Sequence, residues 1–147
     1  MIENKYMQLA LEEAKKASLL GEVPVGAVIV KNGEIISIGR NDREKSNDAT
    51  GHAEIIAIRK ACQKLGGWHL DGCELYVTLE PCPMCMGAII NSRIKRVVYG
   101  AKDAKAGACE SVLNMCAYPL NHKPLTEGGI LAEECAQILS DFFYNKR

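Results

Sequence analysis

Short apolar runs alternate along the chain with segments whose apolar residues recur at helical spacing, and this alternation limits the possible folds most strongly. Residues 25–30 and 35–38 are apolar runs joined by Asn32-Gly33, a pair typical of a tight hairpin turn. Further strands are predicted over residues 74–79 and 96–101. Strands that alternate with helices indicate an α/β domain, with three layers (α/β/α) and a mixed, roughly five-stranded sheet.

The helix-period segments complete this α/β pattern. In them, apolar residues recur every three or four positions with charged residues between. No repeat or linker divides the chain, so residues 1–147 are predicted to form one domain. Hydrophobic residues are 48% of the chain, enough for a core without disulfide staples. Helices are expected over residues 3–20, 52–65, 83–91, 108–116 and 131–144, a loop over 41–50, and an irregular or partly extended stretch over 117–129.

Charge and cysteine content narrow the class of protein. The 18 basic side chains balance the 18 acidic ones, so the chain has no overall field that would attract nucleic acid, and only local patches remain. The first residues lack the pattern of a signal peptide, and no run approaches the roughly 18 apolar residues of a membrane span. A cytoplasmic protein without membrane contact is predicted. The seven cysteines, two of them in C-x-x-C, favour metal or catalytic use over disulfides.

Two short fragments carry the residue types that bind zinc: H-A-E at residues 52–54 and P-C-P-M-C at residues 81–85. Each is ambiguous alone, because C-x-x-C also serves redox chemistry and a single helical histidine is usually structural. Both fragments, however, begin a predicted helix, where the helix dipole lowers a cysteine's pKa and favours the thiolate. Three ligands, His52, Cys82 and Cys85, leave the fourth zinc position open for water, as in catalytic sites.

Glu54 lies two residues after the candidate histidine ligand. From the start of its helix it can reach the open coordination position without being a ligand itself. Zinc lowers the pKa of a bound water towards ~7. A neighbouring carboxylate can then accept the water's proton and return it to the substrate. Glu54 is therefore the predicted catalytic acid–base, and the alternative is a solvated first-turn glutamate favoured by the dipole.

The pattern H-x-E followed by P-C-x-x-C resembles the signature of the cytidine-deaminase-like zinc deaminases. Within that superfamily the chain is similar to the bacterial tRNA adenosine deaminases, chiefly through V-T-L-E-P-C at residues 77–82 and G-A-K-D at residues 100–103. Guanine deaminases share P-C-P-M-C but differ around it. Other matching stretches are residues 22–27, 52–55, 87–89, 92–94, 121–122, 126–128 and 140–143.

This resemblance implies a cytidine-deaminase-like fold, one Zn²⁺ per chain and hydrolysis of the wobble adenosine to inosine in a tRNA anticodon stem-loop. It also implies a homodimer. By resemblance, Asn41 hydrogen-bonds the base, and Val25 and Asp103 are further substrate contacts, Asp103 through a ribose hydroxyl. The alternative for Asn41 and for Asp103 is an ordinary turn residue.

Local features fit an RNA partner but do not require one. Lys102 and Lys105 follow a strand end, the usual rim for ligand-binding loops in α/β sheets. One of three aromatic residues at the C-terminal end of the last helix could stack on an unpaired base. These are Phe142, Phe143 and Tyr144.

Two alternatives to a tRNA deaminase remain. The first keeps the chemistry but acts on a free purine base or nucleoside such as guanine. The second is a non-catalytic zinc-stapled module that binds nucleic acid. That module needs a fourth protein ligand, and no remaining histidine or cysteine is well placed in the sequence to supply one.

The sequence departs from the family pattern directly before the candidate histidine ligand. Residues 48–51 read D-A-T-G, where the family usually has D-P-T-A. Losing the proline and gaining Gly51 is expected to loosen this loop.

Overall fold

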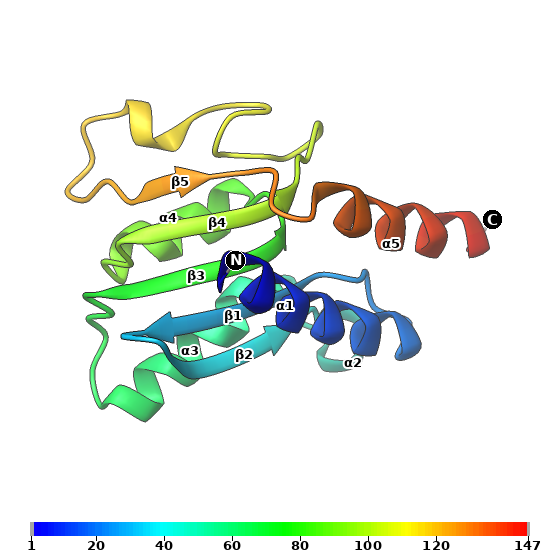
Figure 1. Ribbon diagram of the computed structural model, residues 1–147, viewed down its shortest axis with the longest axis horizontal. Coiled ribbons are helices and arrows are strands. Elements are labelled where there is room, and N and C mark those ends of the chain that lie inside the picture. The colour runs from blue at the N-terminus through cyan, green and yellow to red at the C-terminus, as the bar shows by residue number, and fades with distance from the viewer. Residues whose placement is uncertain (1, 147) are drawn as a thin grey trace.

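The computed structural model describes residues 2–146 (Figure 1). Within them, no helix is long and apolar enough to cross a membrane. Helices and strands alternate as the hydrophobic pattern predicts. The helices are α1 (Ile2–Leu19), α2 (Arg43–Ser46), α3 (Ala53–Leu65), α4 (Pro83–Asn91) and α5 (Ala132–Asn145), and the strands are β1 (Gly26–Lys31), β2 (Glu34–Arg40), β3 (Cys73–Leu79), β4 (Arg96–Ala101) and β5 (Leu125–Glu127).

The strands form one mixed sheet in the order β2-β1-β3-β4-β5. Strand β1 pairs antiparallel with both β2 and β3, whereas β3, β4 and β5 pair in parallel. Strands β2 to β5 therefore all run in one direction and only β1 is reversed. As a result, the carboxyl ends of β2, β3 and β4 meet the amino end of β1 at the same edge of the sheet.

Helices cover both faces of the sheet, which confirms the three-layer prediction (Figure 1). Successive residues of a strand point to opposite faces. In β1, Ala27 and Ile29 pack in the core with α3 and α4, while Val28 and Val30 pack in the core with α1. Helix α5 lies on the same side as α1, where Cys135 is its buried residue.

The predicted hairpin between β1 and β2 is confirmed. Lys31 pairs with Glu34, which leaves a two-residue turn. Asn32 and Gly33 both have positive φ, 51° and 77°. These angles match the turn that follows the right-handed twist of strands, and asparagine and glycine adopt them at the lowest cost.

Two predictions for the connecting segments were wrong. Residues 108–116 are not an α-helix but a series of turns that ends in a 3₁₀ turn, Met115–Ala117. Their backbone N–H groups bond to the buried carboxylate of Glu80 instead of forming a helical ladder. Conversely, the predicted loop over residues 41–50 contains α2. The carboxylate of Glu22 accepts the free N–H groups at the start of α2, which stabilises this single turn.

Two glycines allow helices to lie unusually close to the sheet. A Cβ added to Gly26 would collide with the backbone of α1 at Ala10, and one added to Gly39 would collide with the carbonyl oxygen of Ala53 in α3. The contact at Gly39 matters most for the site, because α3 begins there beside His52.

We expect Gly39→Ala to lower the free energy of unfolding by about 1–3 kcal/mol, the usual cost of overpacking. Gly67→Ala is the matched control, because nothing lies within 4 Å of its added Cβ. Urea unfolding at constant zinc concentration measures both. Equal stability of the two variants would contradict the close approach of α3 to β2.

Candidate active site

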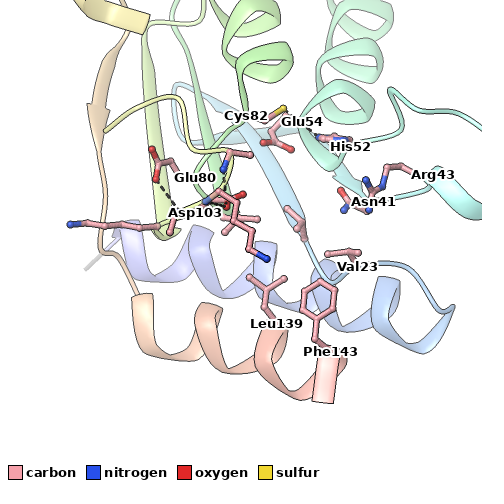
Figure 2. A pocket seen from close by; sticks show the side chains of 16 residues that line it. Val23, Asn41, Arg43, His52, Glu54, Glu80, Cys82, Asp103, Leu139 and Phe143 are labelled. Carbon is pink, nitrogen blue, oxygen red and sulfur yellow. Dashed lines mark hydrogen bonds between the residues drawn. The ribbon is translucent and has the colours of Figure 1, made fainter. Parts of the chain in front are cut away.

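A cavity of about 540 Å³ opens at the sheet edge where the carboxyl ends of β2, β3 and β4 meet (Figure 2). Segments that are far apart in the sequence line it together. They are the connection before β1, the loop after β2, the start of α3, the connection from β3 to α4, the loop after β4, and α5. Their residues are Val23, Val25, Asn41, Arg43, His52, Glu54, Leu79, Glu80, Cys82, Lys102–Ala106, Leu139 and Phe143.

The three predicted metal ligands come together at this cavity. His52 caps α3, Cys82 caps α4, and Cys85 lies in the first turn of α4. The Nδ1 atom of His52 lies 3.7 Å from Sγ of Cys82 and 3.6 Å from Sγ of Cys85. Bond lengths of about 2.3 Å to sulfur and 2.0–2.1 Å to nitrogen separate two tetrahedral zinc ligands by about 3.6 Å. The donor types and their spacing therefore fit zinc.

The environment of the two cysteines favours a thiolate. A hydrogen bond from Cys85, aided by one from His52, lowers the pKa of Cys82 to about 4 even though burial opposes it. The same hydrogen bond and burial raise the pKa of Cys85. The start of α4 adds the positive end of a helix dipole. The cluster thus supplies one thiolate readily, and a metal cation is needed to stabilise the second.

Glu54 projects from the first turn of α3 beside this cluster. Figure 2 shows its carboxylate next to Cys82 and His52, on the wall of the cavity. Glu54 is only 4% exposed. Burial raises the pKa of this carboxyl to about 7, against the opposing effects of its own backbone N–H and of His52. A group at this position and near neutral pKa can both accept and donate a proton.

Within residues 2–146, His52, Cys82 and Cys85 are the one group of three or more metal-binding side chains close enough to share an ion. The other two histidines have different partners. His69 lies 3.6 Å from the carboxylate of Asp71, and Nε2 of His122 is 2.6 Å from the carbonyl oxygen of Ile94. The described residues therefore offer no fourth protein ligand. This fits a catalytic zinc site, which keeps one position open, and does not fit a structural zinc module, which fills all four positions with protein ligands.

Asn41 lies at the cavity, directly after β2, and is 6% exposed. Its Oδ1 accepts the backbone N–H of Ala53 at 2.8 Å. This bond holds the first residue of α3 and so orients the adjacent His52. From the sequence, both ends of the Asn41 amide were expected to be available to a base. Because the oxygen already accepts the N–H of Ala53, the –NH₂ group is left for a ligand.

The other two predicted substrate contacts also line the cavity. Val25 is buried and offers an apolar wall. Asp103 uses Oδ1 to accept the N–H groups of Lys105 and Ala106, at 3.0 and 3.2 Å. The turn role considered for Asp103 is therefore real, and its second carboxylate oxygen faces no partner among these bonds.

Helix α5 closes the side of the cavity opposite the candidate metal ligands. Leu139 and Phe143 project from it towards Val23 (Figure 2). Phe143 is 51% exposed, so one face of its ring is open to a ligand. The sequence indicated an aromatic residue here without selecting one of the three, and it gave no signal for Leu139.

Two glutamates that the sequence argument assigned no role organise the cavity walls. Glu22 accepts the backbone N–H groups of the first turn of α2, which carries Arg43. Glu80 accepts N–H groups from the loop after β4. Both are 2% exposed. A buried glutamate at a strand or helix end needs partners, but the sequence does not reveal which distant N–H groups provide them.

Comparison with known proteins agrees with the motif-based resemblance. The family described as MafB19-like deaminase matches residues 1–147. A protein of Bacillus subtilis (strain 168) named tRNA-specific adenosine deaminase is 49% identical over 143 residues, which cover 97% of this chain and 89% of that protein.

Solved structures include both candidate substrate classes. A structure from studies of A-to-I editing by tRNA:A34 deaminases is 47% identical, with a TM-score of 0.90, and the match covers 92% of this chain and 99% of that chain. A guanine deaminase from Bacillus subtilis is 38% identical, with a TM-score of 0.64 over 80% of this chain and 84% of that chain. The tRNA deaminase structure therefore has both the higher identity and the higher TM-score of these two.

We expect Cys82→Ala to lose the metal and to be less stable, because metal binding is coupled to folding. Glu54→Gln should retain about one equivalent of zinc while its activity falls by about 10²–10⁴-fold, the usual contribution of general acid–base catalysis. Elemental analysis and ammonia release measure the two effects. Near-normal turnover by Glu54→Gln would remove this residue from the chemistry, and full zinc in Cys82→Ala would exclude it as a ligand.

Proposed function

The chain belongs to the tRNA-specific adenosine deaminases, and from this premise we propose that it converts the wobble adenosine of a tRNA anticodon loop to inosine by zinc-dependent hydrolysis. One observation carries the proposal most directly. Three metal-binding side chains with no fourth protein ligand in the described residues lie beside the buried carboxylate of Glu54, at a cavity large enough for a nucleobase.

His52, Cys82 and Cys85 hold one zinc ion in this proposal. When bound, zinc lowers the pKa of water and makes a nucleophile available at neutral pH. Glu54 would accept the first proton of the attacking water and pass it to the purine ring nitrogen, which keeps it in inosine. It would then move the second proton, from the hydroxyl added at the reacting carbon, to the amine, which leaves as ammonia. Its burial excludes bulk water, which keeps the proton on this path.

The remaining cavity residues orient the base. The –NH₂ group of Asn41 donates to an acceptor on the purine edge, because its oxygen is bonded to α3. Val25 and Phe143 provide apolar surface for the ring faces. Asp103 accepts a ribose hydroxyl with the oxygen that its turn leaves free. Bases of an anticodon loop are already unpaired, so extruding one costs less than from a duplex.

Cationic side chains at the cavity support an RNA substrate over a free purine. Arg43, Lys102 and Lys105 line the cavity together with three carboxylates, and Nζ of Lys102 lies 3.1 Å from a carboxylate oxygen of Glu110. A free base has no phosphate for these side chains to bind. The same few cations imply that affinity depends only weakly on salt, since each neutralised phosphate contributes to the slope.

We also propose a homodimer. A second groove, of about 610 Å³, lies on the α4 side of the molecule and is lined by apolar side chains from α4 and from the segment between β4 and β5, among them Ile90, Met115 and Leu120. Trp68 borders this groove and is 56% exposed. Large exposed apolar side chains around one groove are typical of an interaction surface. A second copy of the chain is the occupant that the resemblance favours.

Residues 1–147 form one domain in this proposal, because both cores share a single sheet. We propose the cytoplasm as its location, because the proposed substrate is a tRNA.

We expect the protein to deaminate a short anticodon stem-loop and to leave free adenosine and guanine almost unchanged. Lys102→Ala together with Lys105→Ala should raise the KM for the stem-loop without altering which base is converted. Inosine formation is measured over a range of salt concentrations. Equal turnover of free purines, with no effect of the two lysines, would refute the RNA substrate and leave the deaminase chemistry in place.

We expect Trp68→Glu to convert the dimer to a monomer, because a charge in an apolar interface loses its hydration without gaining a partner. Leu19→Glu, also at an exposed leucine but on α1, is the control. Light scattering gives the mass of each. A monomeric wild-type protein at micromolar concentration would contradict the dimer.

A further inference from the structure

Glu80 binds the loop after β4 through an unusual number of hydrogen bonds. Its Oε1 accepts the N–H of Asp103 at 3.0 Å and the hydroxyl of Ser111. Its Oε2 accepts the N–H groups of Cys109, Glu110 and Ser111 at 3.0, 2.8 and 3.0 Å. One carboxylate thus receives donors from both ends of residues 103–111.

This loop forms one wall of the cavity. Residues 102–106 all line it, including the two rim lysines and Asp103. The loop is wrapped so tightly around Glu80 that a Cβ added to Gly107 would collide with the carboxyl group. Ala108 and Cys109 of the loop are buried in the core, and the other interactions that position it are its bonds to Glu80, because it has no helix or strand of its own.

The bonds require a carboxylate and not merely a polar side chain. A carboxylate offers about four acceptor sites on two oxygens, whereas an amide has one oxygen and two N–H donors. An amide at residue 80 would bring an –NH₂ group against backbone N–H groups that now bond to Oε2.

Glu80 also joins this wall to the candidate metal ligands. It lies two residues before Cys82, and its own N–H donates to the carbonyl oxygen of Ala101 at 2.9 Å. The carbonyl oxygen of Pro81 accepts the N–H of Ala108 at 2.8 Å. Backbone hydrogen bonds therefore link the segment that carries Cys82 to β4 and to the loop that carries Asp103.

We infer that Glu80 is a positioning residue for the substrate: its carboxylate holds residues 103–111 in the conformation that places Asp103, Lys102 and Lys105 at the cavity. Both of its carboxylate oxygens bond to this loop, so it acts on the substrate through the loop. The inference rests on the proposed function, because it assigns this loop to the binding of RNA. It predicts that loss of the carboxylate weakens substrate binding more than it slows the chemical step.

The test compares Glu80→Gln with the wild-type protein, both loaded with zinc. We expect the KM for the anticodon stem-loop to rise about tenfold while kcat changes less than about threefold, since uniform binding is lost but not the reacting groups. Zinc content should stay at one per chain. Amide hydrogen exchange of residues 109–111, measured without substrate, should become faster.

Glu13→Gln is the matched control, since Glu13 is also a buried, bonded carboxylate but lies on α1 and does not line the cavity. An equal rise of KM in this control would overturn the inference by showing a general effect of lost stability. Unchanged KM and unchanged exchange in Glu80→Gln would overturn it as well. Loss of zinc with unchanged amide exchange of residues 109–111 would also overturn it, and would assign Glu80 to the metal segment instead.

Two further measurements keep the outcome decisive. If Glu80→Gln does not fold, Ser111→Ala removes a single donor and should raise KM by about two- to threefold, and an unchanged KM there would overturn the inference. If the wild-type protein does not act on the stem-loop, the proposed function fails. The amide exchange of residues 109–111 would still show whether Glu80 holds the loop, because it needs no substrate.

Discussion

The direction of the strands is the constraint on which the rest of the structure depends. Four strands run one way and β1 runs the other, so the carboxyl ends of β2, β3 and β4 lie together. The connections from β2 to α3 and from β3 to α4 then start two helices at this edge. His52 and Cys82 are the residues at the start of these helices, and the candidate metal-binding cluster follows from their meeting.

Buried carboxylates give the cavity its walls. An ionised carboxylate without partners is very costly to bury, so each one must collect hydrogen bonds. Glu22 and Glu80 obtain them from backbone N–H groups of segments that have little regular structure of their own. These segments thereby gain defined positions. Glu54 lies at the same edge of the sheet, but its pKa is raised to about 7. Burial raises this pKa more than the hydrogen bond from its own backbone N–H lowers it.

Sequence patterns predicted the helices and strands well, because the spacing of apolar residues within a short segment reflects the conformation of that segment itself. The predicted strand 96–101 coincides with β4, and the predicted helix over residues 83–91 coincides with α4. Residues 108–116 were wrongly predicted as helical since their N–H groups bond to Glu80, about 30 positions away in the chain. No local pattern contains that information.

The candidate ligands and Glu54 could be proposed from spacing alone, whereas their neighbours could not. The oxygen of Asn41 is engaged by Ala53, which depends on how α3 approaches β2. Gly51 was expected to loosen its loop. In the structure it is buried, its carbonyl oxygen accepts the N–H of Asp42 at 2.8 Å, and an added Cβ would lie 2.8 Å from the Asp42 carbonyl oxygen. Glycine thus has a packing role there that only the folded chain reveals.

The central claim is that His52, Cys82 and Cys85 bind one zinc ion and leave a position open beside Glu54. X-ray absorption at the zinc edge of the purified protein tests it most directly. The account predicts two sulfur ligands at about 2.3 Å, one imidazole, and one further light atom at about 2.0–2.1 Å that is not part of the protein. A third sulfur or a second imidazole in the shell would contradict it, because such a site would be closed to water.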